Sequence, residues 1–168
     1  LVPVEWEVTT LSQVVPPGRP IVYGILMPGQ GFVGGTPVVK VKDISDDGEI
    51  KVADLLLTDP KIDAAYHRSR LRAGDLLFTI RGTVGRMAFV PTALDGANIT
   101  QDTARISISK ANPRFIRYYL EMPISRSFID LHTLGQAVTG INLEWVRQIP
   151  IPLPMAHAHE RNPSFLPP

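Results

Sequence analysis

The first candidates for chemistry are a glycine pattern and a pair of charged residues. Gly29-x-Gly31-x-x-Gly34 has the spacing of a dinucleotide-binding loop, which needs a helix start after it so that free backbone amides meet the pyrophosphate. The following residues, Thr36 to Val39, predict a strand instead, so a nucleotide site is disfavoured. Glu49-Ile50-Lys51 has the Glu-x-Lys spacing of metal-dependent nucleases, but an exposed ion pair in a hairpin explains it better.

The C-terminal residues offer two further patterns, each with a plain alternative. Asn162-Pro163-Ser164-Phe165 is faintly similar to the Asn-Pro-Pro-Tyr loop of adenine methyltransferases, but no cofactor-binding βα unit precedes it. His157 and His159 are spaced to hold a metal, although no third ligand is placed by the sequence. His67 and His132 have no serine and acid pattern that would make a triad. We therefore expect no catalytic residue and no metal site.

Composition excludes several classes. The 168 residues suit one domain, 44% of them are apolar, and cysteine is absent, which excludes disulfide scaffolds and thiolate zinc sites. We expect neither a transmembrane segment nor a signal peptide, and hence a cytoplasmic protein. Residues 1–66 hold five Lys/Arg and nine Asp/Glu, whereas residues 67–168 hold twelve and seven. The basic half suits a polyanion, and scattered solvated charges are the alternative.

Sixteen prolines and thirteen glycines divide the chain into short segments that predict an α+β fold with a mixed or antiparallel sheet. We expect strands at residues 21–26, 38–44, 76–80, 86–90 and 104–109, with residues 49–52 returning as a hairpin partner. One helix should begin after a cap at Asp59 or Thr58 and another after the cap Asn112. A short helix should cover residues 125–131, and a turn of helix should form around residues 143–146. The alternating prolines of residues 149–154 predict an edge strand.

Three stretches occur in an order that resembles a known family. They are Gly34 to Ile44 (GGTPVVKVKDI), Leu71 to Arg86 (LRAGDLLFTIRGTVGR), and Tyr118 to Pro154, which contains GQAVTGINL and IPIPLP. Together with Trp6 and Leu11 they resemble a target-recognition domain of the specificity subunit of type I restriction–modification enzymes. The resemblance covers residues 6–154. It implies a compact α+β domain within residues 1–154 that binds DNA.

The resemblance also implies partners. Such a subunit carries two recognition domains separated by long helices, and each domain reads one half of a split DNA target. Modification subunits methylate adenine with S-adenosylmethionine, and a restriction subunit uses ATP and Mg to move and cut DNA. The specificity subunit itself catalyses nothing, so no cofactor is expected in this chain. After Pro154 the family continues into a spacer helix. Here Pro163, Pro167 and Pro168 predict that residues 155–168 form an irregular tail without that helix.

Within this resemblance, polar side chains on glycine-containing loops are the candidate DNA contacts. Arginine pairs with guanine and amide side chains pair with adenine, so loops that bring these groups close can read bases. The leading loop is Arg81 to Arg86, with arginines at both ends and glycines that allow close approach. Lys40, Lys42, Arg68 and Arg70 are better suited to phosphates, which position the domain without specifying sequence. The predicted contacts are Lys40, Lys42, Arg68, Arg70, Arg81, Thr83, Arg86, Asn98, Thr100, Gln101, Gln136 and Thr139.

Two other functions remain open from the sequence. The chain could be the recognition portion of a fused adenine methyltransferase or nuclease whose catalytic part lies elsewhere. It could also be a protein-interaction domain that kept the scaffold and lost DNA binding.

Overall fold

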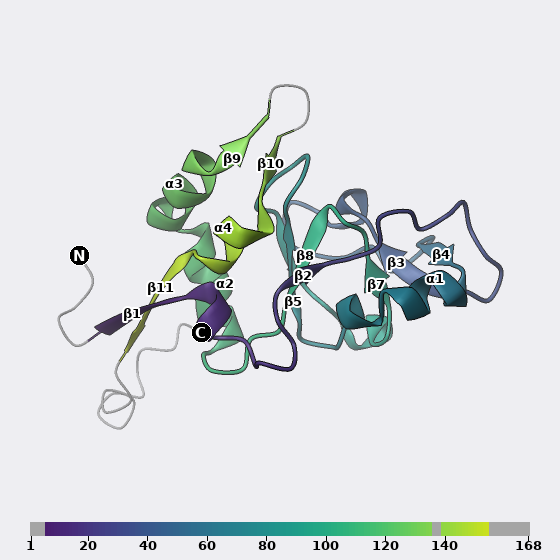
Figure 1. The fold of residues 1–168 in the computed structure, drawn as a ribbon, viewed down its shortest axis with the longest axis horizontal. Helices are drawn as coiled ribbons and strands as arrows, with labels where there is room; N and C mark the ends of the chain where they lie inside the picture. Colours follow the sequence, from purple (N-terminus) through teal and green to yellow (C-terminus); the bar gives the residue numbers. More distant parts are fainter. Residues whose placement is uncertain (1–5, 136–138, 155–168) are drawn as a thin grey trace.

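The computed structural model describes residues 6–135 and 139–154, and Figure 1 shows how their elements are arranged. The strands are β1 (Trp6–Thr10), β2 (Val22–Tyr23), β3 (Thr36–Val39), β4 (Leu56–Thr58), β5 (Leu76–Thr79), β6 (Met87–Phe89), β7 (Asn98–Ile99), β8 (Thr103–Ile106), β9 (Thr133–Leu134), β10 (Gly140–Ile141) and β11 (Pro150–Pro154). The α-helices are α1 (Pro60–Ala65), α2 (Pro113–Glu121), α3 (Pro123–Leu131) and α4 (Leu143–Arg147). The 3-10 turns are η1 (Leu11–Gln13), η2 (Val41–Asp43), η3 (His67–Ser69) and η4 (Thr92–Leu94). The predicted α+β class is confirmed.

A central antiparallel sheet has the strand order β2-β8-β5-β6. All residues of β5 and β8 are buried, because both faces of this sheet are covered. Leu76, Phe78 and Ile106 point to one hydrophobic cluster, whereas Leu77 points to the other. The period-2 alternation of a strand thus serves two cores at once.

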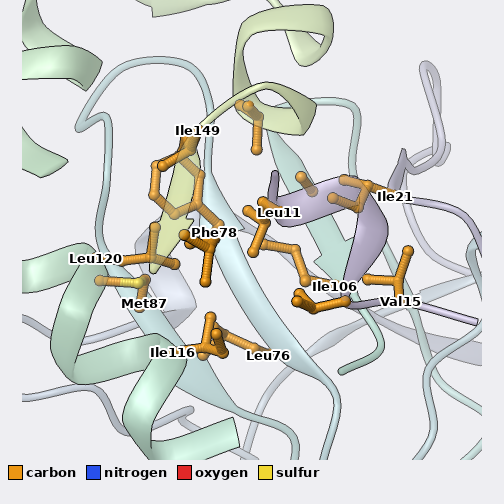
Figure 2. Packing of buried hydrophobic residues seen from close by; sticks show 14 of the residues in the cluster. Leu11, Val15, Ile21, Leu76, Phe78, Met87, Ile106, Ile116, Leu120 and Ile149 are labelled. Carbon is orange, nitrogen blue, oxygen red and sulfur yellow. The ribbon is translucent and has the colours of Figure 1, made fainter. Parts of the chain in front are cut away.

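The larger cluster lies between the central sheet and the terminal elements. Leu11, Ile116, Leu120 and Ile149 belong to this cluster together with Leu76 and Phe78 of β5, and Figure 2 shows them. The strand pair β1–β11 and helices α2, α3 and α4 supply this side of the molecule, on the left of Figure 1. The N-terminal and C-terminal segments therefore close the first core together.

The smaller cluster lies against the opposite face of the central sheet. Val39, Ile44, Leu71 and Ile99 pack with Leu77 there. A second sheet with the order β4-β3-β7 covers this core, with β3 antiparallel to β4 and parallel to β7. It lies with α1 on the right of Figure 1.

Local sequence signals set most element boundaries. Asp59 and Asn112 each accept a hydrogen bond from a backbone amide of the helix that follows, as predicted, and Asn142 caps α4 in the same way. Pro123 begins α3 at its first helical position. Strand β11 pairs with β1 alone among the described residues, which confirms the edge strand predicted from its prolines.

Three predicted strands differ in the structure. Residues 38–44 were expected to form one strand, but β3 ends at Val39 and η2 follows, because the Asp43 carboxylate accepts from the Lys40 amide at 2.9 Å. Residues 49–52 pair through the single bridge Ile44–Ile50 rather than as a strand. The strand expected over residues 21–26 is reduced to β2 and a bridge from Ile25 to Thr100.

The glycine pattern at residues 29–34 leads into β3, as predicted, so no helix start follows it. Both the tail assigned to residues 155–168 and the tail histidines lie outside the described residues.

Candidate nucleic-acid interface

Two of the predicted loops meet at one end of the central sheet. Strands β5 and β8 are antiparallel, and the pair Thr79–Thr103 marks this end. The Ile80 amide donates to the Asp102 carbonyl at 2.8 Å, and the Arg81 amide donates to the same oxygen at 3.3 Å. The loop after β5 and the turn before β8 are therefore neighbours, as their order in the sheet requires.

A third loop is bonded to the first. The β9–β10 hairpin rises at the top of Figure 1, and its residue Gly140 forms a β-bridge with Arg81. The Gly82 amide donates to the Thr139 carbonyl at 2.9 Å, and the Thr139 hydroxyl donates to the Gly82 carbonyl at 2.8 Å. We call the joined residues 81–83 and 139–140 the loop platform.

The polar side chains of the platform face solvent, although the Thr139 hydroxyl already donates to the Gly82 carbonyl. Arg81, Thr83 and Thr139 are exposed, and the Arg81 guanidinium forms no hydrogen bond or ion pair with any other described residue. The Arg81 stem passes close to Gly140, where a β-carbon would lie 3.2 Å from Arg81 Cγ. The structure therefore brings together three of the predicted contacts on one fixed surface.

The turn between β5 and β6 is held by glycine conformations and by hydrogen bonds from a buried threonine. Gly82 and Gly85 have positive φ values of 72° and 83°, a backbone conformation that residues other than glycine rarely adopt. The buried Thr79 hydroxyl donates to the Thr83 carbonyl and accepts from the Arg86 amide at 2.9 Å. These bonds fix the loop without using its exposed side chains.

Arg86 does not project beside Arg81, contrary to prediction. Its guanidinium is 2.5 Å from Asp46 and donates to the Ile44 carbonyl at 2.9 Å, and its side chain is 20% exposed. Arg86 thus fastens the loop to the segment after η2. The two-arginine reader that the sequence predicted is reduced to Arg81.

Lys40 and Lys42 lie near the same end, but not as outward positions of one strand. Lys42 is exposed on η2, whereas Lys40 is half-buried at the start of that turn. Lys42 remains the better placed of the two for a phosphate.

Asn98 and Thr100 were predicted as base contacts, and the structure places both inside. Asn98 is wholly buried, where its amide donates to Asp63 Oδ1 at 2.8 Å and its oxygen accepts from the Ser69 hydroxyl at 2.7 Å. Thr100 is 7% exposed. Both residues read as polar turn formers in the sequence, which does not reveal that β7 is covered. Gln101 is half-buried in the turn beside the platform.

Arg68 and Arg70 lie away from the platform. They lie on the segment that leads to Asp75, which precedes β5, whereas Arg81 follows the other end of this strand. Arg70 is exposed, but its guanidinium binds the buried Asp63 carboxylate at 2.5 Å. Burial alone would raise the pKa of Asp63, yet the hydrogen bonds from Arg70 and Asn98 and the Arg70 charge outweigh it and lower that pKa.

One cation near the platform was missed by the sequence analysis. Arg126 of α3 donates to the Gly85 carbonyl at 3.4 Å, and its Nη1 occupies the space that a β-carbon on Gly85 would fill. No local signal in α3 indicates this long-range contact. Gln136, the remaining predicted contact, lies outside the described residues.

Within the described residues, no group of three His, Cys, Asp or Glu side chains is positioned to hold a metal. No helix of the described part of the chain is long and apolar enough to cross a membrane.

Comparison with known proteins identifies one related sequence and several structures with a similar fold. No family model matches the chain. Over 156 residues the chain is 31% identical to the type I restriction enzyme EcoBI specificity subunit of Escherichia coli, a match that takes in 92% of the chain. The chain is related to type I restriction specificity subunits. The match spans 32% of the length of that subunit, so the chain corresponds to about a third of the relative.

Solved structures agree on the fold. The HsdS subunit from Thermoanaerobacter tengcongensis matches 91% of the chain with a TM-score of 0.61 and 21% identity, over 39% of its own length. A chain from a structure of type I R-M complex assembly and conformational transition matches 96% with a TM-score of 0.67 and 20% identity, over 41% of its length. The chain therefore shares the fold of part of these chains, and the predicted resemblance to the specificity subunit of type I restriction enzymes is confirmed.

Proposed function

We propose that this target-recognition domain is a sequence-specific DNA-binding module that reads one half of a bipartite target. The relation to a type I specificity subunit supports this function. The loop platform supports it independently, because it offers hydrogen-bonding side chains on a surface that the fold holds in place.

The exposed Arg81 on the platform is the observation that carries the proposal. A guanidinium pairs with O6 and N7 of guanine through two parallel hydrogen bonds, which demands a fixed approach. The hydrogen bonds between Gly82 and Thr139 fix the backbone next to Arg81. An arginine on a backbone that is already fixed loses less conformational freedom on binding than an arginine on a mobile loop. Thr83 and Thr139 would add hydroxyl contacts beside it.

Phosphate contacts would surround this centre and set its register on the duplex. Lys42 is exposed on η2, and Arg126, whose side chain is 37% exposed, lies over Gly85. Lys40 and Gln101 are partly accessible at the same end. We assign Arg86, Asn98 and Thr100 to support of the fold rather than to DNA.

The proposed partners are double-stranded DNA, a modification subunit and a restriction subunit. In such a complex S-adenosylmethionine, ATP and Mg would bind to the partner subunits, and this chain would be the non-catalytic, cytoplasmic component of a DNA modification and restriction system. The relative is a specificity subunit, which disfavours the recognition portion of a fused methyltransferase or nuclease. A protein-interaction domain without DNA binding is the alternative that the next experiment separates.

Selection of bound duplexes from a random pool tests the proposal. We expect one short sequence motif to be enriched. The affinity for that sequence should be at least about a thousandfold above the affinity for random duplex, since the ratio is roughly 10³–10⁷ in specific recognition. Retention of DNA with no enriched motif would overturn sequence reading. Failure to retain any duplex would support the protein-interaction alternative.

A further inference from the structure

A pocket lies at the end of the central sheet away from the loop platform. It opens between the turn before β2 and η3, and its volume is about 340 Å³. Asp75 and Ser107 mark this end, because they flank the pair Leu76–Ile106. The lining residues are Pro17, Gly18, Arg19, Pro20, His67, Arg68 and Arg72.

The lining carries three arginines and no acid. Arg68 and Arg72 are exposed, so their guanidinium groups are able to reach a ligand. Arg19 is held in place instead, since it donates to Asp75 Oδ2 at 2.7 Å and to the Ser107 hydroxyl at 3.0 Å. The pocket thus combines one fixed cation with two adjustable ones.

A fourth arginine is buried beside the pocket and joins two of its lining residues. Arg105 is 1% exposed, and its Nη2 donates to the carbonyls of Pro20 at 3.1 Å and Arg68 at 2.9 Å, which belong to opposite walls of the pocket. Its Nη1 donates to the Ser107 hydroxyl at 2.6 Å, while its buried Nε has no partner among the described residues. The pocket is therefore built around a buried cation.

Positive charge is in excess here. Arg19, Arg68 and Arg72 line the pocket and Arg105 is buried beside it, whereas the nearby carboxylate of Asp75 already binds Arg19 and accepts from the Ser107 hydroxyl at 2.5 Å. The pKa of Arg105 is lowered to about 10, chiefly by burial and also by the positive charges of Arg19 and Arg72. The negative charge of Asp75 opposes this shift but does not cancel it. A bound anion would neutralise this excess where the fold does not.

We propose that this pocket binds a phosphoryl oxyanion, held by Arg68 and Arg72 beside the fixed Arg19 and favoured by the buried charge of Arg105 behind them. Arginine matches the oxygens of a phosphate through paired hydrogen bonds, and a partly enclosed site strengthens those bonds. The proposal does not depend on base reading by Arg81, because the two sites lie at opposite ends of β5.

Thermal unfolding of the full chain in inorganic phosphate tests the site. At constant ionic strength, we expect phosphate at ten times its Kd to raise Tm by roughly 3–5 °C relative to chloride. The double variant Arg68→Ala/Arg72→Ala should lose this shift. The variant Arg114→Ala, which removes an exposed arginine from α2, should keep it. A Tm shift no larger than that in chloride, or one retained by the double variant, would overturn the proposal.

A second arm identifies the source of the phosphate. If the pocket holds the DNA backbone, Arg68→Ala/Arg72→Ala should weaken binding of selected and random duplexes by the same factor, about tenfold or more. If the phosphate belongs to a small molecule, the affinity for both duplexes should be unchanged while the phosphate-dependent Tm shift is lost. The phosphate measurement needs no DNA, so failure of the proposed function leaves this result readable.

Discussion

Gly82 and Thr139, 57 positions apart in the chain, hold each other through two hydrogen bonds of 2.9 and 2.8 Å. One joins backbone to backbone, and the other uses the threonine hydroxyl. These bonds join the loop after β5 to the β9–β10 hairpin, and the exposed Arg81 lies at their junction.

Loss of the Thr139 hydroxyl tests this coupling. Thr139→Val keeps the shape of the side chain but removes its bond to the Gly82 carbonyl. We expect binding of the selected duplex to weaken by about 0.5–1.5 kcal/mol, the usual worth of one hydrogen bond, with random duplex unaffected. Thr92→Val, an exposed threonine at the far end of the β5–β6 hairpin, is the control. Equal weakening on both duplexes would show that the hydroxyl does not orient a base reader.

Asn98 should govern stability rather than sequence preference. Asn98→Ala leaves Asp63 and Ser69 with unmade hydrogen bonds inside the protein, which costs about 1–3 kcal/mol of unfolding free energy. Chemical denaturation measures this loss. Gln148→Ala removes an exposed amide and should change stability by less than about 0.5 kcal/mol. A fully stable Asn98→Ala variant with altered base preference would return Asn98 to the DNA interface.

Asp63 should make stability depend on acid pH. Its pKa in the folded protein lies below the ordinary 3.8, so its ionised form stabilises the fold above that pH. That contribution declines as pH falls below 3.8 and through the folded-state pKa. Asp63→Asn should lower the free energy of unfolding at pH 7, and the difference from the unmodified protein should shrink below pH 3.8. A difference that is constant from pH 7 to pH 3 would exclude this ion pair as its source.

Duplex binding should fall steeply with salt. If about five phosphates are contacted, log K should decrease with log salt at a slope of roughly −4 to −5, because binding releases condensed counterions. Titrations between low and moderate salt measure the slope. An affinity that stays level across this range would contradict a surface of phosphate-binding cations.

Much of the fold follows from local signals. The caps Asp59 and Asn112 lie before the helices that they predict, because each side chain needs only the next turn of backbone. The alternating prolines of β11 likewise restrict it to an edge. The expected strand over residues 38–44 is wrong because one carboxylate, Asp43, turns the backbone at Lys40.

The candidate site was less predictable, since it depends on contacts between distant segments. Arg81 and Arg86 look equivalent in the sequence, and only the fold places Asp46 against Arg86. Asn98 looks like a surface amide until Asp63 is brought to it across 35 positions. Loops can be recognised from glycine and polar residues, whereas the aim of each side chain is set by tertiary structure.

The affinity of Arg81→Ala for the selected duplex and for random duplex tests the central claim most directly. We expect a loss of about 1–3 kcal/mol on the selected duplex and little change on random DNA, with Arg114→Ala close to the unmodified protein on both. An equal loss on the two duplexes, or no loss on either, would contradict base reading by the loop platform.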